Sequence, residues 1–149
     1  MIRILIDADF ILEALMNHNE FAEDVRELLD RVHPSIQIYL TDIGWEKIYA
    51  YVTRLKNSKI AEIVVDWLQE KIQICVVDQI ILYKARSLPL HDFESAVELV
   101  CVSHQQLNAI VTHKQADFAD IQNKFWVWSI ADLWLRANLE TQLQASISI

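Results

Sequence analysis

Glycine is nearly absent from this sequence, which has one, Gly44, among 149 residues. A Walker A loop, a GxGxxG dinucleotide loop and a GxSxG nucleophile elbow each require at least two glycines. The sequence therefore excludes the usual motifs with which an α/β protein binds a nucleotide or builds a serine nucleophile.

Cysteine is also scarce. Cys75 and Cys101 lie in apolar runs, and there is neither a CxxC motif nor paired Cys and His spacing. We expect both to be buried, reduced thiols, not a disulfide or a zinc site. No apolar run approaches the ~20 residues of a membrane span, and the first residues leave no room for a signal peptide. The expected location is the cytoplasm, without a membrane partner.

Positive charge is in deficit, and the net charge is −8. This argues against non-specific nucleic-acid binding through a basic face. It does not argue against a metal-dependent nuclease, because bound cations reverse the local field. Hydrophobic residues make up 53% of the chain, so disorder is not expected. The length suits one domain, which we predict over residues 1–149.

Short apolar runs alternate with amphipathic helical patterns along the chain. The runs predict strands at residues 2–6, 36–40, 72–77, 109–111 and 125–128. The helical patterns predict helices at residues 21–32, 45–55, 60–68, 79–86, 93–105 and 130–143. Such alternation favours an α/β fold, here a three-layer α/β/α sandwich with a mainly parallel sheet of about five strands.

Acidic residues follow most of the predicted strands or open the helix before the fourth. These acids are Asp7, Asp9, Asp42, Glu46, Asp78, Asp92, Glu94 and Asp117. In an open parallel sheet, sites form beyond the carboxyl ends of the strands. We therefore expect acids from separate segments to meet at one edge of the sheet.

Helix capping is a simpler explanation for some of these acids. Asp42, Asp78 and Asp92 could each be an N-cap or a first-turn acid, and for Asp78 we favour the cap. Glu46 lies beside the apolar stripe of its helix, where a solvated position is the ordinary alternative. Asp7 is harder to explain in this way, because a carboxylate directly after a buried strand is costly unless it is paired or bound to metal.

A divalent cation would resolve the repulsion among clustered carboxylates, which cannot all ionise at close range without compensation. Mg²⁺ and Mn²⁺ prefer oxygen ligands and keep several waters. They can activate water and stabilise an in-line attack on a phosphodiester. The pattern therefore predicts chemistry that depends on carboxylates and metal.

LIDADFILEAL, at the first predicted strand, resembles the first motif of PIN domains, in particular of the VapC-like toxin ribonucleases. In that motif an Asp is followed two positions later by Asn, Ser or Asp. TDIGWEKIYAYV is similar to the second, a segment that begins with Ser or Thr and has a Glu on the next helix. DFESAVELVCVSHQQLNAIVTHKQADF is similar to the third and fourth, in which an Asp-Ala pair opens a helix and an acid follows a strand that ends in Thr.

The resemblance implies a Mg²⁺- or Mn²⁺-dependent endoribonuclease, with RNA as substrate. Such proteins are often the toxin of a toxin–antitoxin pair and often homodimers, so an antitoxin and a second copy are the implied partners. By position, Asp7 would be the first metal ligand, supported by Asp9. Glu46 would be the second acid and Asp117 the last.

Two positions depart from the resembled pattern. Ser95 stands where the Asp of the Asp-Ala pair is expected, and Asp92 and Glu94 are candidate substitutes. Lys114 stands two residues after Thr112, where the family usually has Asp or Asn. Its ammonium could take part of the metal's electrostatic role or contact RNA phosphate. The alternative to an active enzyme is therefore a catalytically degenerate PIN-like module that binds a protein partner or RNA.

The predicted site combines the motif positions with the substitutes. The residues predicted to act in catalysis are Asp7, Glu46, Asp92, Glu94 and Asp117. The predicted metal ligands are Asp7, Asp9, Glu46, Glu94 and Asp117.

Overall fold

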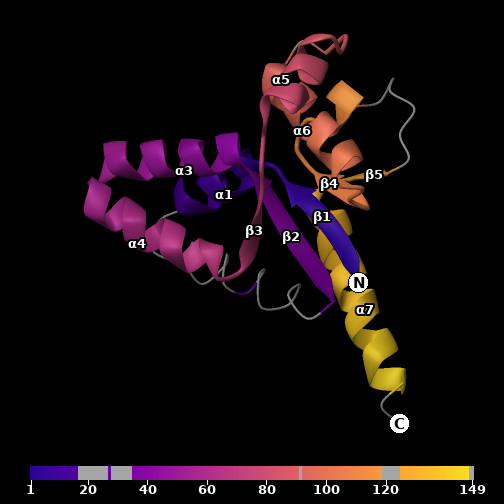
Figure 1. Ribbon diagram of the computed structural model, residues 1–149. Helices are drawn as coiled ribbons and strands as arrows, with labels where there is room; N and C mark the ends of the chain where they lie inside the picture. The colour runs from indigo at the N-terminus through magenta and orange to yellow at the C-terminus, as the bar shows by residue number, and fades with distance from the viewer. Residues whose placement is uncertain (17–26, 28–34, 91, 119–124, 148–149) are drawn as a thin grey trace.

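The computed structural model describes residues 1–16, 27, 35–90, 92–118 and 125–147 (Figure 1). Within them the strands form one sheet of order β3-β2-β1-β4-β5, and every neighbouring pair is parallel. The strands are β1 (Ile2–Ile6), β2 (Ile36–Thr41), β3 (Ile72–Cys75), β4 (Ala109–Val111) and β5 (Trp126–Trp128). The prediction of a parallel sheet of about five strands is confirmed.

Helices cover both faces of this sheet. They are α1 (Ala8–Met16), α3 (Asp42–Leu55), α4 (Ser58–Gln69), α5 (Gln79–Arg86), α6 (Phe93–His104) and α7 (Ile130–Ile147), with a 3₁₀ helix, η2 (Gln115–Phe118). Side chains of α1, α3, α4 and α7 join the apolar cluster on one face, and side chains of α5 and α6 join the cluster on the other. This is the predicted three-layer α/β/α sandwich.

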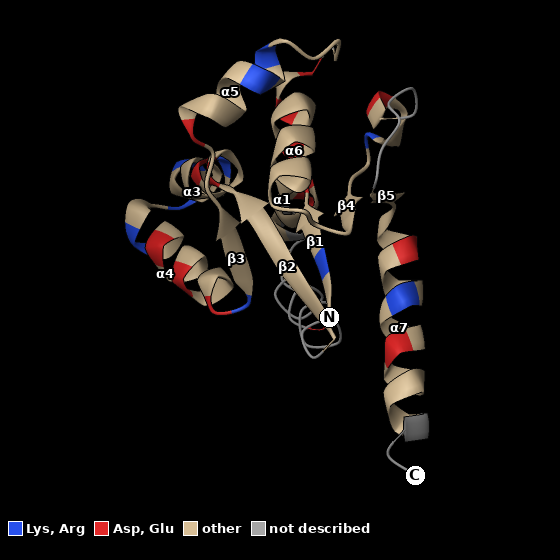
Figure 2. Cartoon of the chain, turned by 45° about the vertical axis from the view of Figure 1, so that its right-hand side comes forward, with Lys and Arg blue, Asp and Glu red and all other residues tan. Residues whose placement is uncertain are grey.

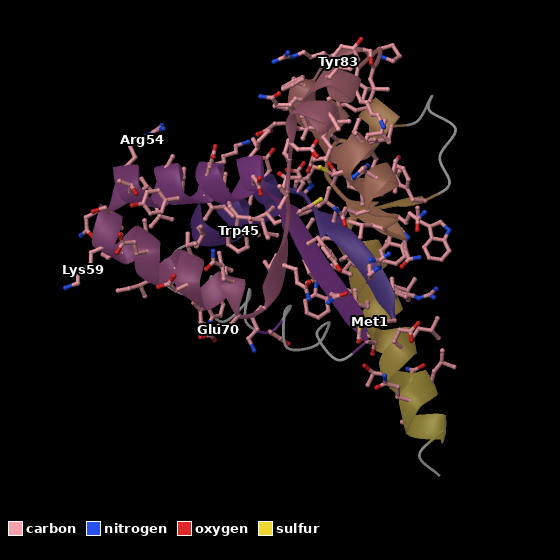
Figure 3. All side chains as sticks on the ribbon, viewed as in Figure 1. Met1, Trp45, Arg54, Lys59, Glu70 and Tyr83 are labelled. Atoms are coloured by element: carbon pink, nitrogen blue, oxygen red, sulfur yellow. The ribbon has the colours of Figure 1, made fainter. Side chains whose placement is uncertain are left out.

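The central strand β1 contributes to both clusters because successive side chains of a strand point to opposite faces. Ile4 and Ile6 belong to the cluster under α1, α3 and α4, whereas Leu5 belongs to the cluster under α5 and α6. Trp45 lies between α3 and the sheet, while Arg54 and Lys59 point away from it (Figure 3). The end of β1 is therefore enclosed on both sides, which fixes the position of the residue that follows it.

Polar caps set the starts of the helices that follow β2 and β3. The Thr41 side chain accepts a hydrogen bond from the Gly44 N–H at 3.0 Å, so α3 begins three residues before the predicted start. Asp78 accepts from the Ile81 N–H at 2.8 Å and is the N-cap of α5, as favoured from the sequence.

Gly44 lets α3 approach the end of β2 closely. A Cβ atom there would lie 2.7 Å from Leu40 Cδ1 and 3.3 Å from Ala8 Cβ. Both neighbours are buried, so neither has free space to move into. The single glycine thus has a packing role, since it allows α1, β2 and α3 to converge.

The structure differs from the prediction at several element boundaries. β3 ends at Cys75, not at residue 77, because its partner Thr41 is the last residue of β2. The Val77 N–H donates to Asp42 Oδ2 instead, at 3.1 Å. Helix α1 was not predicted at all. The helix predicted at residues 21–32 lies outside the described residues, apart from Glu27. Among the described residues, none of the helices combines the length and the hydrophobicity that a membrane span requires.

Candidate functional site

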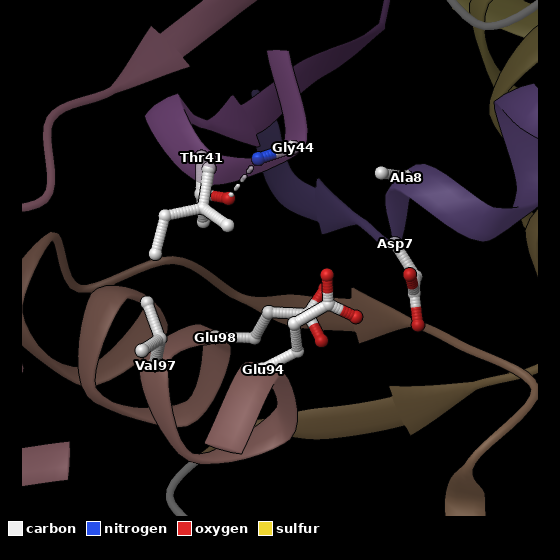
Figure 4. Close-up of a pocket in the computed structure, with 8 residues that line it drawn as sticks. Asp7, Ala8, Thr41, Gly44, Glu94, Val97 and Glu98 are labelled. Atoms are coloured by element: carbon white, nitrogen blue, oxygen red, sulfur yellow. Dashed lines mark hydrogen bonds between the residues drawn. The ribbon is translucent and has the colours of Figure 1, made fainter. Parts of the chain in front are cut away.

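The carboxyl ends of the central strands and the first turns of α6 enclose a small pocket with a volume of about 10 Å³, partly open to solvent (Figure 4). Its lining comes from three regions that are far apart in the sequence. The residues are Asp7, Ala8, Thr41, Ile43, Gly44, Glu94, Val97 and Glu98. This is the sheet edge at which the acids were predicted to meet.

Asp7 follows β1 directly and is 3% exposed. Its Oδ1 accepts a hydrogen bond from the Asp9 N–H at 3.0 Å, and its Oδ2 accepts from the Thr112 hydroxyl at 3.2 Å. Burial raises the pKa of Asp7 above its ordinary value, and the nearby Asp9 charge adds to that effect. The ionised form of Asp7 is therefore not fully compensated by its own neighbours.

Lys47 of α3 forms ion pairs with two acids of the cluster, one on α1 and one on α6. Its Nζ lies 2.8 Å from Asp9 Oδ1 and 3.1 Å from both carboxylate oxygens of Glu94. Burial tends to raise the pKa of Asp9, but the Lys47 hydrogen bond and charge outweigh burial and lower it. Lys47 thus links α1 to α6 through its ion pairs with Asp9 and Glu94.

Lys114 supplies a second ammonium beside the same acids. Its Nζ lies 2.5 Å from Asp92 Oδ2, 3.6 Å from Asp9 Oδ2 and 3.7 Å from Glu94 Oε2. Burial alone would lower the pKa of Lys114, but the Asp92 hydrogen bond and the charges of Asp7 and Asp92 raise it. This lysine is therefore charged at neutral pH and neutralises part of the cluster.

Ser95 stands where the resemblance calls for an acid, and it is fully buried. Its Oγ lies 3.1 Å from Asp117 Oδ2 and 3.3 Å from Asp92 Oδ2. A hydroxyl has one proton, so it donates to one of these carboxylates at a time. Ser95 joins η2 to the first turn of α6, and it adds no negative charge.

Glu98 was missed by the sequence analysis. It is 7% exposed, and its Oε1 has no hydrogen-bond partner among the described residues. Burial raises the pKa of Glu98 well above its ordinary value, and the charges of Asp7 and Glu94 raise it further. Figure 4 shows its carboxyl group beside that of Glu94, inside the pocket that Asp7 also lines. Its position as the one acid in the apolar run AVELVCV could have indicated a buried carboxylate.

Glu46 does not join the other predicted acids. Its side chain is exposed, lines no part of the pocket, and makes no hydrogen bond or ion pair with the residues that the structure describes. The reason is the pitch of α3: Gly44 faces the pocket, and Lys47, three residues later, shares that side of the helix. The side chain of α3 that reaches the acidic cluster is therefore Lys47, and not Glu46.

The other predicted residues are brought together. Asp7, Asp9, Asp92, Glu94 and Asp117 are linked through Thr112, Ser95, Lys47 and Lys114 by the bonds given above. Elsewhere acids and bases are mixed, as on α4 and α7 (Figure 2). In the described part of the chain, no three acidic, His or Cys side chains are already arranged to hold a metal ion. The cluster nevertheless offers the carboxylate oxygens that Mg²⁺ and Mn²⁺ prefer.

Solved structures with a similar fold include toxin–antitoxin complexes. VapBC-1 from nontypeable Haemophilus influenzae has a TM-score of 0.61 at 12% identity, over 84% of this chain and 96% of that chain. VapBC2 from Rickettsia felis, bound to a DNA fragment from its promoter, has a TM-score of 0.59 at 12% identity, over 85% and 99% of the two chains. At such identities the likeness shows a shared fold.

The family is shown by the sequence itself. Residues 3–116 match the family model of the PIN domain, which is most of the chain. No curated protein matches. The matched range runs from the second residue of β1 past the end of β4, and it contains every described acid of the cluster except Asp117, which lies one residue beyond it. The chain therefore belongs to the PIN-domain family.

Proposed function

We propose that this protein is an endoribonuclease that hydrolyses RNA phosphodiesters with Mg²⁺ or Mn²⁺. The observation that carries the proposal is Asp7, a carboxylate buried at the end of the central strand, with a raised pKa and two glutamates in the same pocket. A buried, incompletely compensated carboxylate is stabilised by a bound cation. PIN-family membership and the similarity to structures described as VapBC complexes support the same reaction class.

The residues fit such an ion in the chemistry of their donor atoms. Carboxylates of Asp7 and Glu94 would hold it, while the Asp9 N–H and the Thr112 hydroxyl keep Asp7 in place. A bound Mg²⁺ or Mn²⁺ activates water and stabilises charge on a phosphodiester. Lys47 orients the Glu94 carboxylate by donating to both of its oxygens. On this proposal Glu46, being exposed, lies outside the group that holds the ion.

The test is cleavage of a labelled RNA panel by the wild type, by Asp7→Asn and by Asp66→Asn, whose exposed acid on α4 is the matched control. We expect Asp7→Asn to lose about 100-fold or more, since a residue that only supports a metal ligand is already worth about 10–100-fold. EDTA should abolish cleavage and Mn²⁺ should restore it. Undiminished cleavage by a folded Asp7→Asn protein would refute the proposal.

A degenerate module is the second candidate, and the two lysines in the cluster favour it. Lys47 and Lys114 already neutralise Asp9, Asp92 and Glu94, so an ion has to compete with them. The two candidates differ in whether Mn²⁺ raises the melting temperature, because a ligand that binds the folded state stabilises it. A melting temperature that does not respond to millimolar Mn²⁺ would favour the module, which would bind a protein partner or RNA.

The proposed setting is that of a cytoplasmic toxin, in which residues 1–149 act as one PIN-like domain. The similar structures are described as VapBC and toxin–antitoxin complexes, which supports an antitoxin as partner. Expression of the wild type should slow growth, and Asp7→Asn should not. A homodimer is also proposed, and sedimentation that finds only monomer at high concentration would contradict it.

A further inference from the structure

The first turn of α6 lacks an acid at the position where the resemblance calls for one. Ser95 is buried there and lies within hydrogen-bond distance of Asp117 and Asp92. It therefore acts as a donor toward carboxylates, not as a carboxylate. The negative charge that the Asp of the third motif would contribute therefore has to come from another residue.

Glu98 lies on the same side of α6, because residues three apart on a helix are neighbours. Its Oε1 is buried without a hydrogen-bond partner in the described part of the chain, and its side chain lines the pocket with Asp7 and Glu94. A buried carboxylate oxygen without a partner is strongly unfavourable. Such an atom, directed into a pocket that two other acids line, calls for a cation.

Lys47 and Lys114 do not supply this cation. Lys47 and Lys114 form their ion pairs with Asp9, Asp92 and Glu94, and neither forms one with Asp7 or Glu98. The acidic cluster thus has two parts. The outer part is paired with these ammonium groups. Asp7 and Glu98, the inner part, form no ion pair with another described residue, and the Lys114 charge acts on them only from a longer distance.

We infer that Glu98 is a metal ligand that replaces the carboxylate absent at Ser95, so that Mg²⁺ or Mn²⁺ is held by Asp7, Glu94 and Glu98. The inference rests on the proposed metal-dependent function. It assigns the third acidic position to a residue one helical turn further along α6 than the resembled motif does.

Calorimetric titration with Mn²⁺ tests the assignment on the full chain without measuring cleavage. The proteins are the wild type, Glu98→Gln and the matched control Glu62→Gln, an exposed glutamate of α4. We expect Glu98→Gln to weaken Mn²⁺ binding by about tenfold or more and to lose most of the Mn²⁺-dependent rise in melting temperature. Glu62→Gln should bind as the wild type does.

A second variant separates a ligand from a merely structural residue. Adding Ser95→Asp to Glu98→Gln returns a carboxylate to the position of the resembled motif, and we expect it to recover Mn²⁺ binding at least in part. Wild-type affinity in a folded Glu98→Gln protein would overturn the inference and leave the proposed function intact. If the wild type itself binds no Mn²⁺ at millimolar concentration, both the inference and the metal-dependent function are wrong.

Discussion

Asp7 and Glu98 are the residues whose electrostatics differ most from those of ordinary surface acids, since both are buried and both have a raised pKa. Asp7 is held by two hydrogen bonds. Glu98 has an oxygen without a partner among the described residues. This difference makes the charge on Glu98 the more unfavourable of the two in the metal-free protein.

Glu98→Gln should therefore stabilise the protein in EDTA, by about 1 kcal/mol at pH 7, because a neutral amide is less costly to bury than an ionised carboxylate. With a raised folded-state pKa, the folded protein keeps a proton that the unfolded chain loses. Stability therefore falls as pH rises from about 4.3, the unfolded value, to the folded pKa. Urea denaturation between about pH 4 and pH 8 should show that the free energy of unfolding of Glu98→Gln exceeds that of the wild type near pH 8 but not near pH 4. A gain of the same size at every pH would contradict this account.

Lys114→Met should have opposite effects on folding and on metal binding. The variant loses the ion pair with Asp92, so we expect the free energy of unfolding at pH 7 to fall by about 1 kcal/mol. Since Lys114 lowers the pKa of Asp92 and of Asp9 against the effect of burial, that loss should fade as pH falls through their folded pKa values. Removing a competing cation should also tighten Mn²⁺ binding.

Calorimetry and urea denaturation check both effects, with the exposed Lys59→Met as control. Weaker Mn²⁺ binding in the Lys114→Met protein would show that this lysine supports the site instead of competing with the ion.

The sequence allowed the acids that follow strands or open helices to be predicted, because the carboxyl edge of a parallel sheet brings such positions together. It did not reveal that Lys47 faces the cluster while Glu46 faces solvent, since that depends on the rotation of α3 set by Thr41 and Gly44. Glu98 was missed because it lies inside an apolar helix, where only packing decides which face is enclosed.

At the level of elements, strands and capped helices were predicted well because they have a clear period and a polar start. Helix α5 has its predicted bounds, and Asp78 caps it. Helix α1 was missed because ADFILEALM is short and apolar at most positions, and such a run cannot be assigned to a helix or a strand from its pattern alone. The end of β3 was misplaced because the apolar run IQICVV continues beyond the last residue with which β2 can pair.

Gly44→Ala tests how closely these elements approach one another. In an isolated helix, alanine would be more favourable than glycine by about 1 kcal/mol, so helix propensity alone would make the variant more stable. A Cβ atom 2.7 Å from Leu40 Cδ1 would instead overpack the buried end of β2, at a cost of about 1–3 kcal/mol. We expect a net loss of about 1 kcal/mol in urea denaturation. The exposed Glu46→Ala in the same helix should change stability little, and a more stable Gly44→Ala protein would contradict the packing argument.

For the molecule as a whole, burial of the thiols offers a measure of global unfolding. Cys75 of β3 and Cys101 of α6 are both free and buried, in the core between the sheet and helices α5 and α6. We expect a thiol reagent to label them only as fast as the whole fold opens. A reducing agent should leave the melting temperature unchanged. Rapid labelling in native buffer, or a melting temperature that falls with reductant, would contradict this expectation.

The strand order has a consequence for synthesis on the ribosome. β1 leaves the ribosome early, yet it lies between β2 and β4 in the sheet. The Thr112 hydroxyl that holds Asp7 is 105 residues further along the chain. At roughly 5–20 residues per second, translation reaches it some 5–20 s later. A ribosome-bound nascent chain would thus remain without its completed acidic edge until most of the protein has been made, so any activity of this site would begin only late in synthesis.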